Sequence, residues 1–119
     1  MGLSELLDKL RELSKTAVVV EGKRDKEAIK KLGIENVITI AGKRLTDLAD
    51  ILEGTPQVIP LFDLDEHGER IHKKVVAILS SQGYILIDEF REKLKEYGVI
   101  YVEDLYEKVR SAKKPAGSG

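Results

Sequence analysis

Short apolar runs alternate with single segments of helical spacing, and this alternation constrains the fold more than any other feature of the sequence. The runs at 17–20, 37–40, 58–62 and 84–87 are almost wholly apolar. They are too short for buried helices and are typical of strands covered on both faces. Strands joined by single helices pair in parallel through right-handed crossovers. The sequence therefore predicts an α/β, Rossmann-like fold, with a four-stranded and mainly parallel sheet and helices on both faces.

Apolar spacing and glycines locate the expected helices. Ser4 is a suitable N-cap for a first helix. Each later helix is expected to end at a glycine, which suits the left-handed conformation found just beyond many helices. The first helix would bury Leu6, Leu7, Leu10 and Leu13, and the next four would end at Gly33, Gly54, Gly83 and Gly98.

The remaining elements are less regular. A short fifth strand is expected over 99–102, and a closing helix over 103–110. Pro60 interrupts the third apolar run and cannot donate a ladder hydrogen bond, so we expect it at a sheet edge or a bulge. Four tyrosines are expected to be packing residues, namely Tyr84, Tyr97, Tyr101 and Tyr106.

Composition limits the class of protein. At 119 residues we expect one domain over 1–110, followed by a disordered tail over 111–119. No cysteine is present, so disulfides and thiolate metal sites are excluded. No apolar run approaches the roughly 18 to 20 residues of a membrane helix, and no secretory signal is evident, so a cytoplasmic protein is expected. The net charge is −1, so a nucleic-acid partner would have to meet a local basic patch or a metal-bridged phosphate.

Two acidic turns follow two of the expected strands. Glu21 comes directly after the first apolar run, and Asp63 and Asp65 come directly after the third. Parallel strands end at the same sheet edge, where ligands bind in open α/β sheets. Three carboxylates there would repel one another unless a cation lay between them. Mg²⁺, for which Mn²⁺ can substitute, prefers such oxygen ligands. The alternative is that Asp65 or Asp25 is only a helix N-cap.

Cationic and histidine side chains lie beside these turns. Lys23 and Arg24 follow Glu21, and Lys43 and Arg44 follow the second expected strand. They are candidates to neutralise phosphate or transition-state charge, and the alternative is a solvated loop. Lys23 is the preferred catalytic candidate because it is close to Glu21. His67, inside the second acidic turn, is a candidate proton donor or phosphate contact.

The two turns together resemble a known domain. The run Val18–Asp25, followed by Phe62–Gly68, resembles the Toprim domain shared by type IA and type II topoisomerases, bacterial primases, recombination mediators of the RecR type and overcoming-lysogenization-defect nucleases. The resemblance covers roughly residues 16 to 90. It is strongest to small single-domain members and to ribonuclease M-five, which matures 5S ribosomal RNA. The features shared with that nuclease are Asp63-x-Asp-x-x-Gly-Glu-x-Ile71 and the pair Ala41-Gly42.

The resemblance implies roles for individual residues. Glu21 would act as general acid or base and as a metal contact, while Asp63 and Asp65 would bind magnesium. Gly22 would let the backbone approach the substrate, and Gly42 would belong to the same substrate-binding edge. Family chemistry breaks or joins phosphodiester bonds, with Mg²⁺ stabilising charge on the phosphate. We therefore expect a magnesium-dependent nuclease, acting in RNA processing or on DNA.

Three other functions remain open at this stage. A RecR-like module would bind nucleic acid, or a repair or replication protein, without catalysis. A primase-like enzyme would transfer nucleotides. A CheY-like receiver also has acids at strand ends, but there the paired acids are adjacent and early in the chain. Substrate recognition by so short a chain is expected to need a protein partner or a homodimer.

Overall fold

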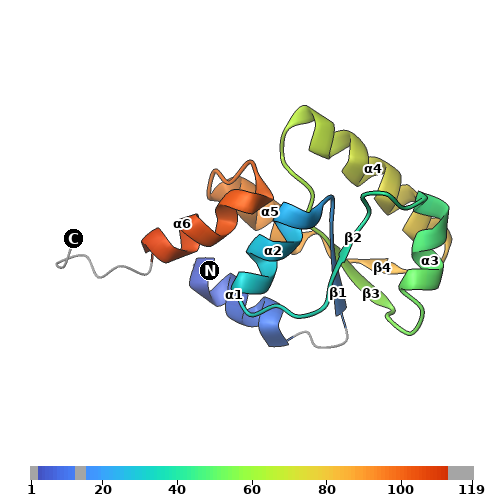
Figure 1. The fold of residues 1–119 in the computed structure, drawn as a ribbon, viewed down its shortest axis with the longest axis horizontal. Coiled ribbons are helices and arrows are strands. Elements are labelled where there is room, and N and C mark those ends of the chain that lie inside the picture. Colours follow the sequence, from blue (N-terminus) through green and yellow to red (C-terminus); the bar gives the residue numbers. More distant parts are fainter. Residues whose placement is uncertain (1–2, 13–15, 113–119) are drawn as a thin grey trace.

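A parallel sheet in the order β2-β1-β3-β4 lies between two layers of helices (Figure 1). The computed structural model describes residues 3–12 and 16–112. The strands are β1 (Thr16–Val20), β2 (Val37–Thr39), β3 (Gln57–Pro60) and β4 (Ile85–Leu86). The helices are α1 (Leu3–Glu12), α2 (Lys23–Lys31), α3 (Leu48–Ile51), α4 (Glu66–Ser81), α5 (Glu89–Glu96) and α6 (Leu105–Ala112), with 3₁₀ turns η1 (Leu45–Asp47) and η2 (Val102–Asp104).

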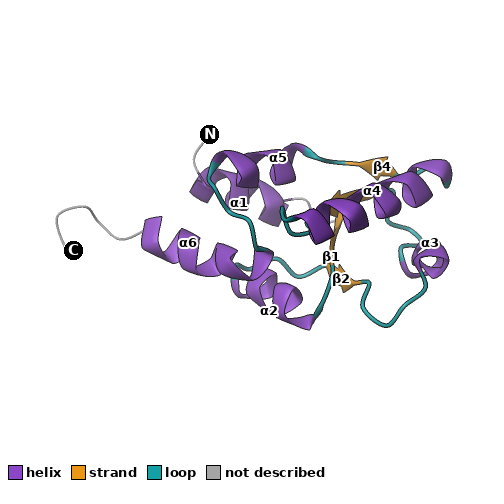
Figure 2. Ribbon diagram, turned by 90° about the horizontal axis from the view of Figure 1, so that it is seen from above, coloured by secondary structure: helices purple, strands orange, loops and turns teal. Residues whose placement is uncertain are grey.

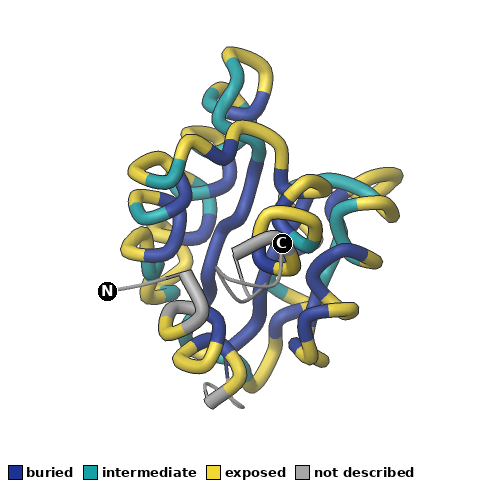
Figure 3. Tube along the Cα trace, turned by 90° about the vertical axis from the view of Figure 1, so that its left-hand side faces the viewer, coloured by how far each residue is buried: buried dark blue, intermediate teal, exposed yellow. Residues whose placement is uncertain are grey.

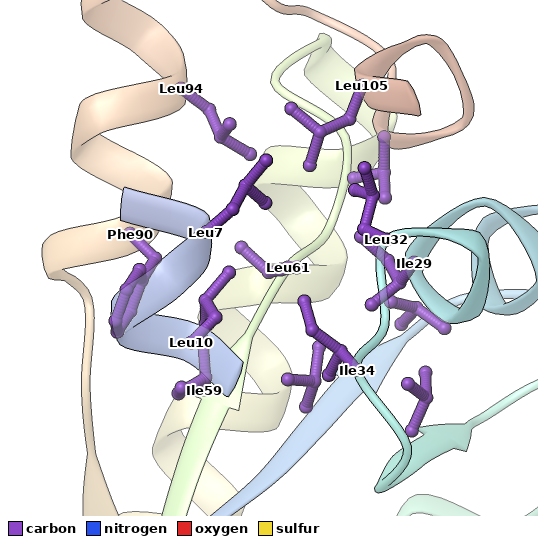
Figure 4. Packing of buried hydrophobic residues seen from close by; sticks show 14 of the residues in the cluster. Leu7, Leu10, Ile29, Leu32, Ile34, Ile59, Leu61, Phe90, Leu94 and Leu105 are labelled. Atoms are coloured by element: carbon purple, nitrogen blue, oxygen red, sulfur yellow. The ribbon is translucent and has the colours of Figure 1, made fainter. Parts of the chain in front are cut away.

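Alternate residues of the central strands build two separate cores. Val18 and Ile59 face α1, α2, α5 and α6, whereas Val19 and Val58 face α3 and α4. Figures 1 and 2 show these two helical layers on opposite sides of the strands. In the larger core, Figure 4 shows side chains from α1, α2 and α5 packed over Leu61. Figure 3 shows the buried backbone running through the interior and the exposed backbone on the outer turns. The strands are thus covered on both faces, as their continuous apolar character predicts.

The strand order creates a switch point at the centre of the sheet. Every recorded strand pair is parallel, and β1 pairs with β2 on one side and with β3 on the other. The connection after β1 therefore leads to β2 on one side, and the connection after β3 leads to β4 on the other, so a crevice forms outside the carboxyl ends of β1 and β3. Glu21 is the first residue after β1, and Asp63 follows three residues after the end of β3. The switch point places both acidic turns in one region.

Most of the predicted elements are confirmed. The α/β class, the parallel pairing and the four strands are all present, and the expected helices precede glycines with positive φ, such as Gly33 and Gly83 at +89°. The segment expected as one helix over 45–52 consists of η1 followed by the single turn of α3. Within the described ranges, no helix is long and apolar enough to cross a bilayer.

The predicted fifth strand is wrong. Residues 99–101 are irregular and lead into η2, because their backbone bonds the loop after β3 instead of a neighbouring strand. The amide of Leu64 donates to the carbonyl of Ile100 at 2.7 Å, and the amide of Val102 donates to the Asp63 carboxylate at 2.8 Å. The segment is therefore attached to the acidic turn.

Pro60 lies in β3, a central strand, so the expectation of a sheet edge is wrong. The reason for that expectation, that its missing N–H must face no ladder partner, is correct. Along β3, Leu61 donates to Val19 of β1 at 2.8 Å, so the alternate position, Pro60, faces β4. Strand β4 extends only as far as Leu86, which pairs with Val58. The missing N–H of Pro60 therefore points past the end of the neighbouring strand, where no ladder bond would form.

Smaller differences concern the ends of the chain and one tyrosine. Helix α1 begins at Leu3, so Ser4 lies within the helix and does not precede it. Leu13 and residues 113–119, which include most of the predicted tail, lie outside the described residues. Tyr101 is 45% exposed, so its expected role in packing is wrong, whereas Tyr97 and Tyr106 pack against the larger core.

Replacing Leu61 tests the two-layer core. Leu61 is 1% exposed in the larger core, so Leu61→Ala should lower the free energy of unfolding by about 2–5 kcal/mol, because it removes buried methyl groups and leaves a cavity. Ile85 is 56% exposed on β4, and Ile85→Ala should cost about 0.5 kcal/mol. Urea unfolding followed by circular dichroism measures both. Equal losses would contradict the assignment of Leu61 to the core.

Candidate functional site

The site is built at the carboxyl ends of β1 and β3. The register pairs Val19 with Pro60, so the residues after the two strands leave the sheet side by side. Burial raises the pKa of the Asp63 carboxyl, and the negative charges of Asp65, Glu21 and Glu103 raise it further. The 3.0 Å contact between Glu21 Oε1 and His67 Nε2, two residues beyond Asp65, shows that the two turns meet at this edge. The predicted convergence of Glu21, Asp63 and Asp65 at one sheet edge is thus found in the fold.

Each of the three predicted ligands is held by a protein donor. Glu21 Oε1 lies 3.0 Å from His67 Nε2, and Asp63 Oδ1 accepts from the amide of Val102. Asp65 is the N-cap of α4, because its Oδ1 accepts from the amide of Gly68 at 2.7 Å. The N-cap alternative for Asp65 is therefore realised in the structure. The two acidic turns are also joined to each other through the Glu21–His67 contact.

The turn after β3 is closed against the first turn of α4 at Gly68. A Cβ placed on Gly68 would lie 2.0 Å from the carbonyl oxygen of Asp63 and 2.9 Å from its Cα. No side chain fits there, so the glycine of the Asp-x-Asp-x-x-Gly run is required for packing. Its role is to let the start of α4 approach the backbone of Asp63.

A buried arginine supports the same turn, and the sequence analysis missed it. Arg91 of α5 is 5% exposed; its Nε donates to the carbonyl of Phe62 at 3.1 Å and its Nη2 to that of Asp63 at 2.8 Å. Glu69 of α4 pairs with the same guanidinium at 2.9 Å, and this hydrogen bond lowers the pKa of Glu69. Arg91 lies in a segment rich in lysine and glutamate, which is typical of a solvated helix. No local signal separates it from its neighbours.

A second missed contribution comes from the start of η2. Glu103 follows Val102, and its charge raises the pKa values of both Asp25 and Asp63. Burial is the largest cause for Asp25, whose pKa is raised to about 6, although a 3.3 Å hydrogen bond from the amide of Gly22 acts in the opposite direction. The N-cap alternative for Asp25 is wrong, because Gly22 is the N-cap of α2 and Asp25 is its third residue; the Asp25 carboxylate accepts from the N-cap amide and belongs to the acidic edge.

The donor set suits a hard divalent cation, but it is not a preformed cage. Within the described part of the chain, no three His, Asp or Glu side chains are grouped so as to hold one ion. The group nevertheless consists of oxygen donors whose charges repel one another, and Mg²⁺ usually takes only one or two direct carboxylates and completes its shell with water. Glu21, Asp63 and Asp65 therefore offer the type of donor that such an ion takes, and they remain its candidate ligands.

The turn after β2, which contains Ala41 and Gly42, also lies beside Glu21. The amide of Ala41 donates to the carbonyl of Glu21 at 2.9 Å, which holds this turn against the end of β1. Within the turn, Gly42 has a φ of +76°, a conformation that favours glycine. The ammonium of Lys43 donates to the carbonyl of Thr39 at 2.6 Å, and Arg44 pairs with Asp47 at 3.5 Å. The side chains of Lys43 and Arg44 are therefore both occupied by local partners.

Lys23 and Arg24 lie in the first turn of α2 with exposed side chains.

His72 and Asp88 lie away from the acidic edge, on α4 and at the start of α5. The ring of His72 packs edge-on to Phe62, with 6.5 Å between ring centroids, and its Nε2 is 3.5 Å from Asp88 Oδ1. Asp88 occupies the N-cap position of α5 without a side-chain capping bond. This pair contributes nothing to the acidic edge.

A family comparison assigns the fold. A Toprim domain family model matches residues 16–102, a stretch that includes both acidic turns and the segment attached to Asp63. The chain belongs to the Toprim family. As a Toprim protein it carries the glutamate and the paired aspartates at the carboxyl ends of two adjacent parallel strands.

Relatives that match most of the chain are found among archaeal and bacterial proteins. A UPF0292 protein of Pyrococcus abyssi is 35% identical, with 85% of this chain and 79% of that protein covered. A UPF0292 protein of Thermococcus kodakarensis is 37% identical, with 86% and 79% covered. A solved structure, described as a putative protein from Aquifex aeolicus, is 47% identical with a TM-score of 0.83, and 87% of this Toprim chain and 97% of that chain are covered.

Two glycines of the site should respond differently to a methyl group. Gly68→Ala should lower the free energy of unfolding by about 1–3 kcal/mol or more, because the new Cβ meets the Asp63 carbonyl. Gly22→Ala is the matched control: its φ is −138° and nothing lies within 4 Å of its Cβ position, so its loss should stay below about 1 kcal/mol, the cost of alanine at an N-cap. Thermal unfolding measures both. A stable Gly68→Ala variant would contradict the close approach of α4 to Asp63.

Asp25 should make stability depend on pH. Its folded pKa of about 6 exceeds its ordinary value of 3.8, so the folded state binds the proton more tightly and loses stability as the pH rises through this window. Asp25→Asn keeps an acceptor for the Gly22 amide but carries no charge. The melting temperature of the variant relative to the parent should therefore increase from pH 4 to pH 7. A difference that is constant across this range would contradict the raised pKa.

Proposed function

We propose that this Toprim protein is a magnesium-dependent nuclease that hydrolyses phosphodiester bonds in RNA or DNA. Family membership indicates metal-dependent action on nucleic acid, or binding to it. The observation that supports hydrolysis is the pairing of Glu21 with His67 beside Asp63 and Asp65. A proton-transfer pair and a metal-binding group then lie at the same sheet edge, as metal-assisted hydrolysis requires.

Asp63 and Asp65 would hold the magnesium ion together with Glu21. When bound, the ion would neutralise charge on the phosphate and lower the pKa of its water. The chain positions these ligands through contacts on the protein side of the turn. Arg91 fixes the backbone carbonyl of Asp63, and Val102 fixes one oxygen of its carboxylate. The turn is therefore positioned by the protein itself, which limits the reorganisation needed when the ion binds.

Glu21 is the proposed proton acceptor. Its Oε1 lies 3.0 Å from His67 Nε2, so the imidazole in its Nε2–H tautomer orients the carboxylate, and the carboxylate takes the proton from the attacking water. His67 is also 59% exposed, which leaves the ring open to a phosphate of the substrate. Lys23 lies two residues beyond Glu21 with an exposed side chain, and we propose that it neutralises charge developing on the phosphate.

Non-catalytic binding is the second candidate. Each of the three carboxylates already has a protein donor, so the edge has defined contacts in the absence of an ion. That arrangement would also suit a module that presents a fixed surface to nucleic acid or to a repair or replication protein. Ile100 is 50% exposed on the segment attached to the acidic turn, and the segment is a candidate surface for a protein partner or a second copy.

Glu21→Gln tests the enzyme directly. The amide keeps the size and the contact to His67 but cannot accept a proton, so Mg²⁺-dependent cleavage of labelled RNA or DNA should fall by about 10²–10⁴-fold. Asp88→Asn, outside the acidic edge, is the matched control and should cleave at the parent rate. Single-turnover gel assays measure the rates, and circular dichroism confirms folding.

Three results would contradict the proposal. Undiminished cleavage by Glu21→Gln would exclude Glu21 from proton transfer. Nucleic-acid binding without cleavage, in both the parent and the variant and with Mg²⁺ present, would favour the binding module. Template-dependent incorporation of nucleotides would instead favour a primase-like enzyme.

A further inference from the structure

We infer that one face of α2 binds the sugar–phosphate backbone of the nucleic-acid strand beside the acidic edge. Lys23, Lys26 and Lys30 are three and four residues apart, so their side chains form one stripe along the helix. Together with Glu27 and Thr39 they line a hollow of about 410 Å³. The inference rests on the proposed function and identifies how that site would hold its polymeric substrate.

The positive charge of this lysine stripe is not neutralised by partners within the protein. Within the part of the chain that the structure describes, the three ammonium groups form neither ion pairs nor hydrogen bonds. Other cations are different: Arg91, Arg44 and Lys93, for example, pair with carboxylates. Glu27 is the one acid among the residues that line the hollow, so the face retains a net positive charge.

A further cation contacts Thr39, the residue of β2 that lines the hollow. Thr39 ends β2, and the ammonium of Lys43 is bonded to its carbonyl oxygen at 2.6 Å and to its hydroxyl at 3.1 Å. On the other side of α2, Lys31 lies over the ring of Tyr106, 5.4 Å from the centroid, and so faces α6. The lysines of α2 therefore divide between a packed side and the side that faces the hollow.

The position of the stripe relative to Glu21 suits a polyanion. Helix α2 starts two residues after Glu21 and leads away from the acidic edge, as Figure 1 shows. The seven helical rises from Lys23 to Lys30 span about 10 Å of helix. One strand of a duplex carries about three phosphates over that length, at roughly 3.4 Å each. Carboxylates at the edge repel a phosphodiester chain, and cations beside them offset this repulsion.

The double variant Lys26→Ala/Lys30→Ala tests the inference without involving catalysis. Fluorescence anisotropy in EDTA gives the affinity for a labelled single strand and a labelled duplex over a range of NaCl concentrations. Each lysine that contacts phosphate should reduce the slope of log affinity against log salt by about 0.7 for a single strand and 0.9 for a duplex. The two slopes also show which form is bound. Lys26→Glu/Lys30→Glu should weaken binding further.

Lys73→Ala/Lys74→Ala is the matched control, because these two lysines are exposed and helical but lie on α4. An unchanged slope in the α2 variant, an equal change in the control, or a parent protein that binds no nucleic acid would overturn the inference. Failure of the proposed function gives a different result: the parent binds with the lysine-dependent slope but does not cleave when Mg²⁺ is added. If the protein cleaves, but the slope of log affinity against log salt does not depend on Lys26 and Lys30, the proposed nuclease function stands. The inference that the α2 stripe binds the backbone is then wrong.

Discussion

The parallel pairing of β1 with β3 is the constraint on which the site depends. It places Glu21 and the Asp63 turn at neighbouring strand ends, where their charges repel and raise the pKa of Asp63. Buried strands with apolar residues on both faces fix this pairing, because a shift of one residue would exchange the two cores. The energy of the cores therefore holds together side chains that would otherwise move apart.

The protein opposes the repulsion with contacts from elements late in the chain. Helix α5 contributes Arg91 to the carbonyls of the acidic turn, and the first residue of η2, Val102, contributes its amide to the carboxylate of Asp63. A buried arginine that bonds two carbonyls and Glu69 has its donors well satisfied, which offsets the cost of burying its charge. The residues after β4 are thus part of the site, although they carry neither of the acidic turns.

Electrostatics also divide the surface around the site. The carboxyl ends of β1 and β3 are acidic, while the exposed face of α2 is basic, and the net charge of −1 hides this separation. An acidic edge suits a divalent cation, and a basic face next to it suits the polyanion on which that cation would act. This arrangement is consistent with a substrate that lies along α2 and reaches the edge at Glu21.

The sequence by itself determined the strands, most helix ends and the residues of the acidic turns, because these depend on local patterns: apolar runs, glycines after helices, and carboxylates after strands. It could not determine the contacts of Arg91, Glu103 or Pro60. Arg91 looks like one more charged residue of a solvated helix, and only the packing of α5 on the sheet buries it. Pro60 is tolerated in a central strand only because β4 stops before reaching it. Tertiary structure decided these features, because the partners that satisfy each group lie tens of residues away in the chain.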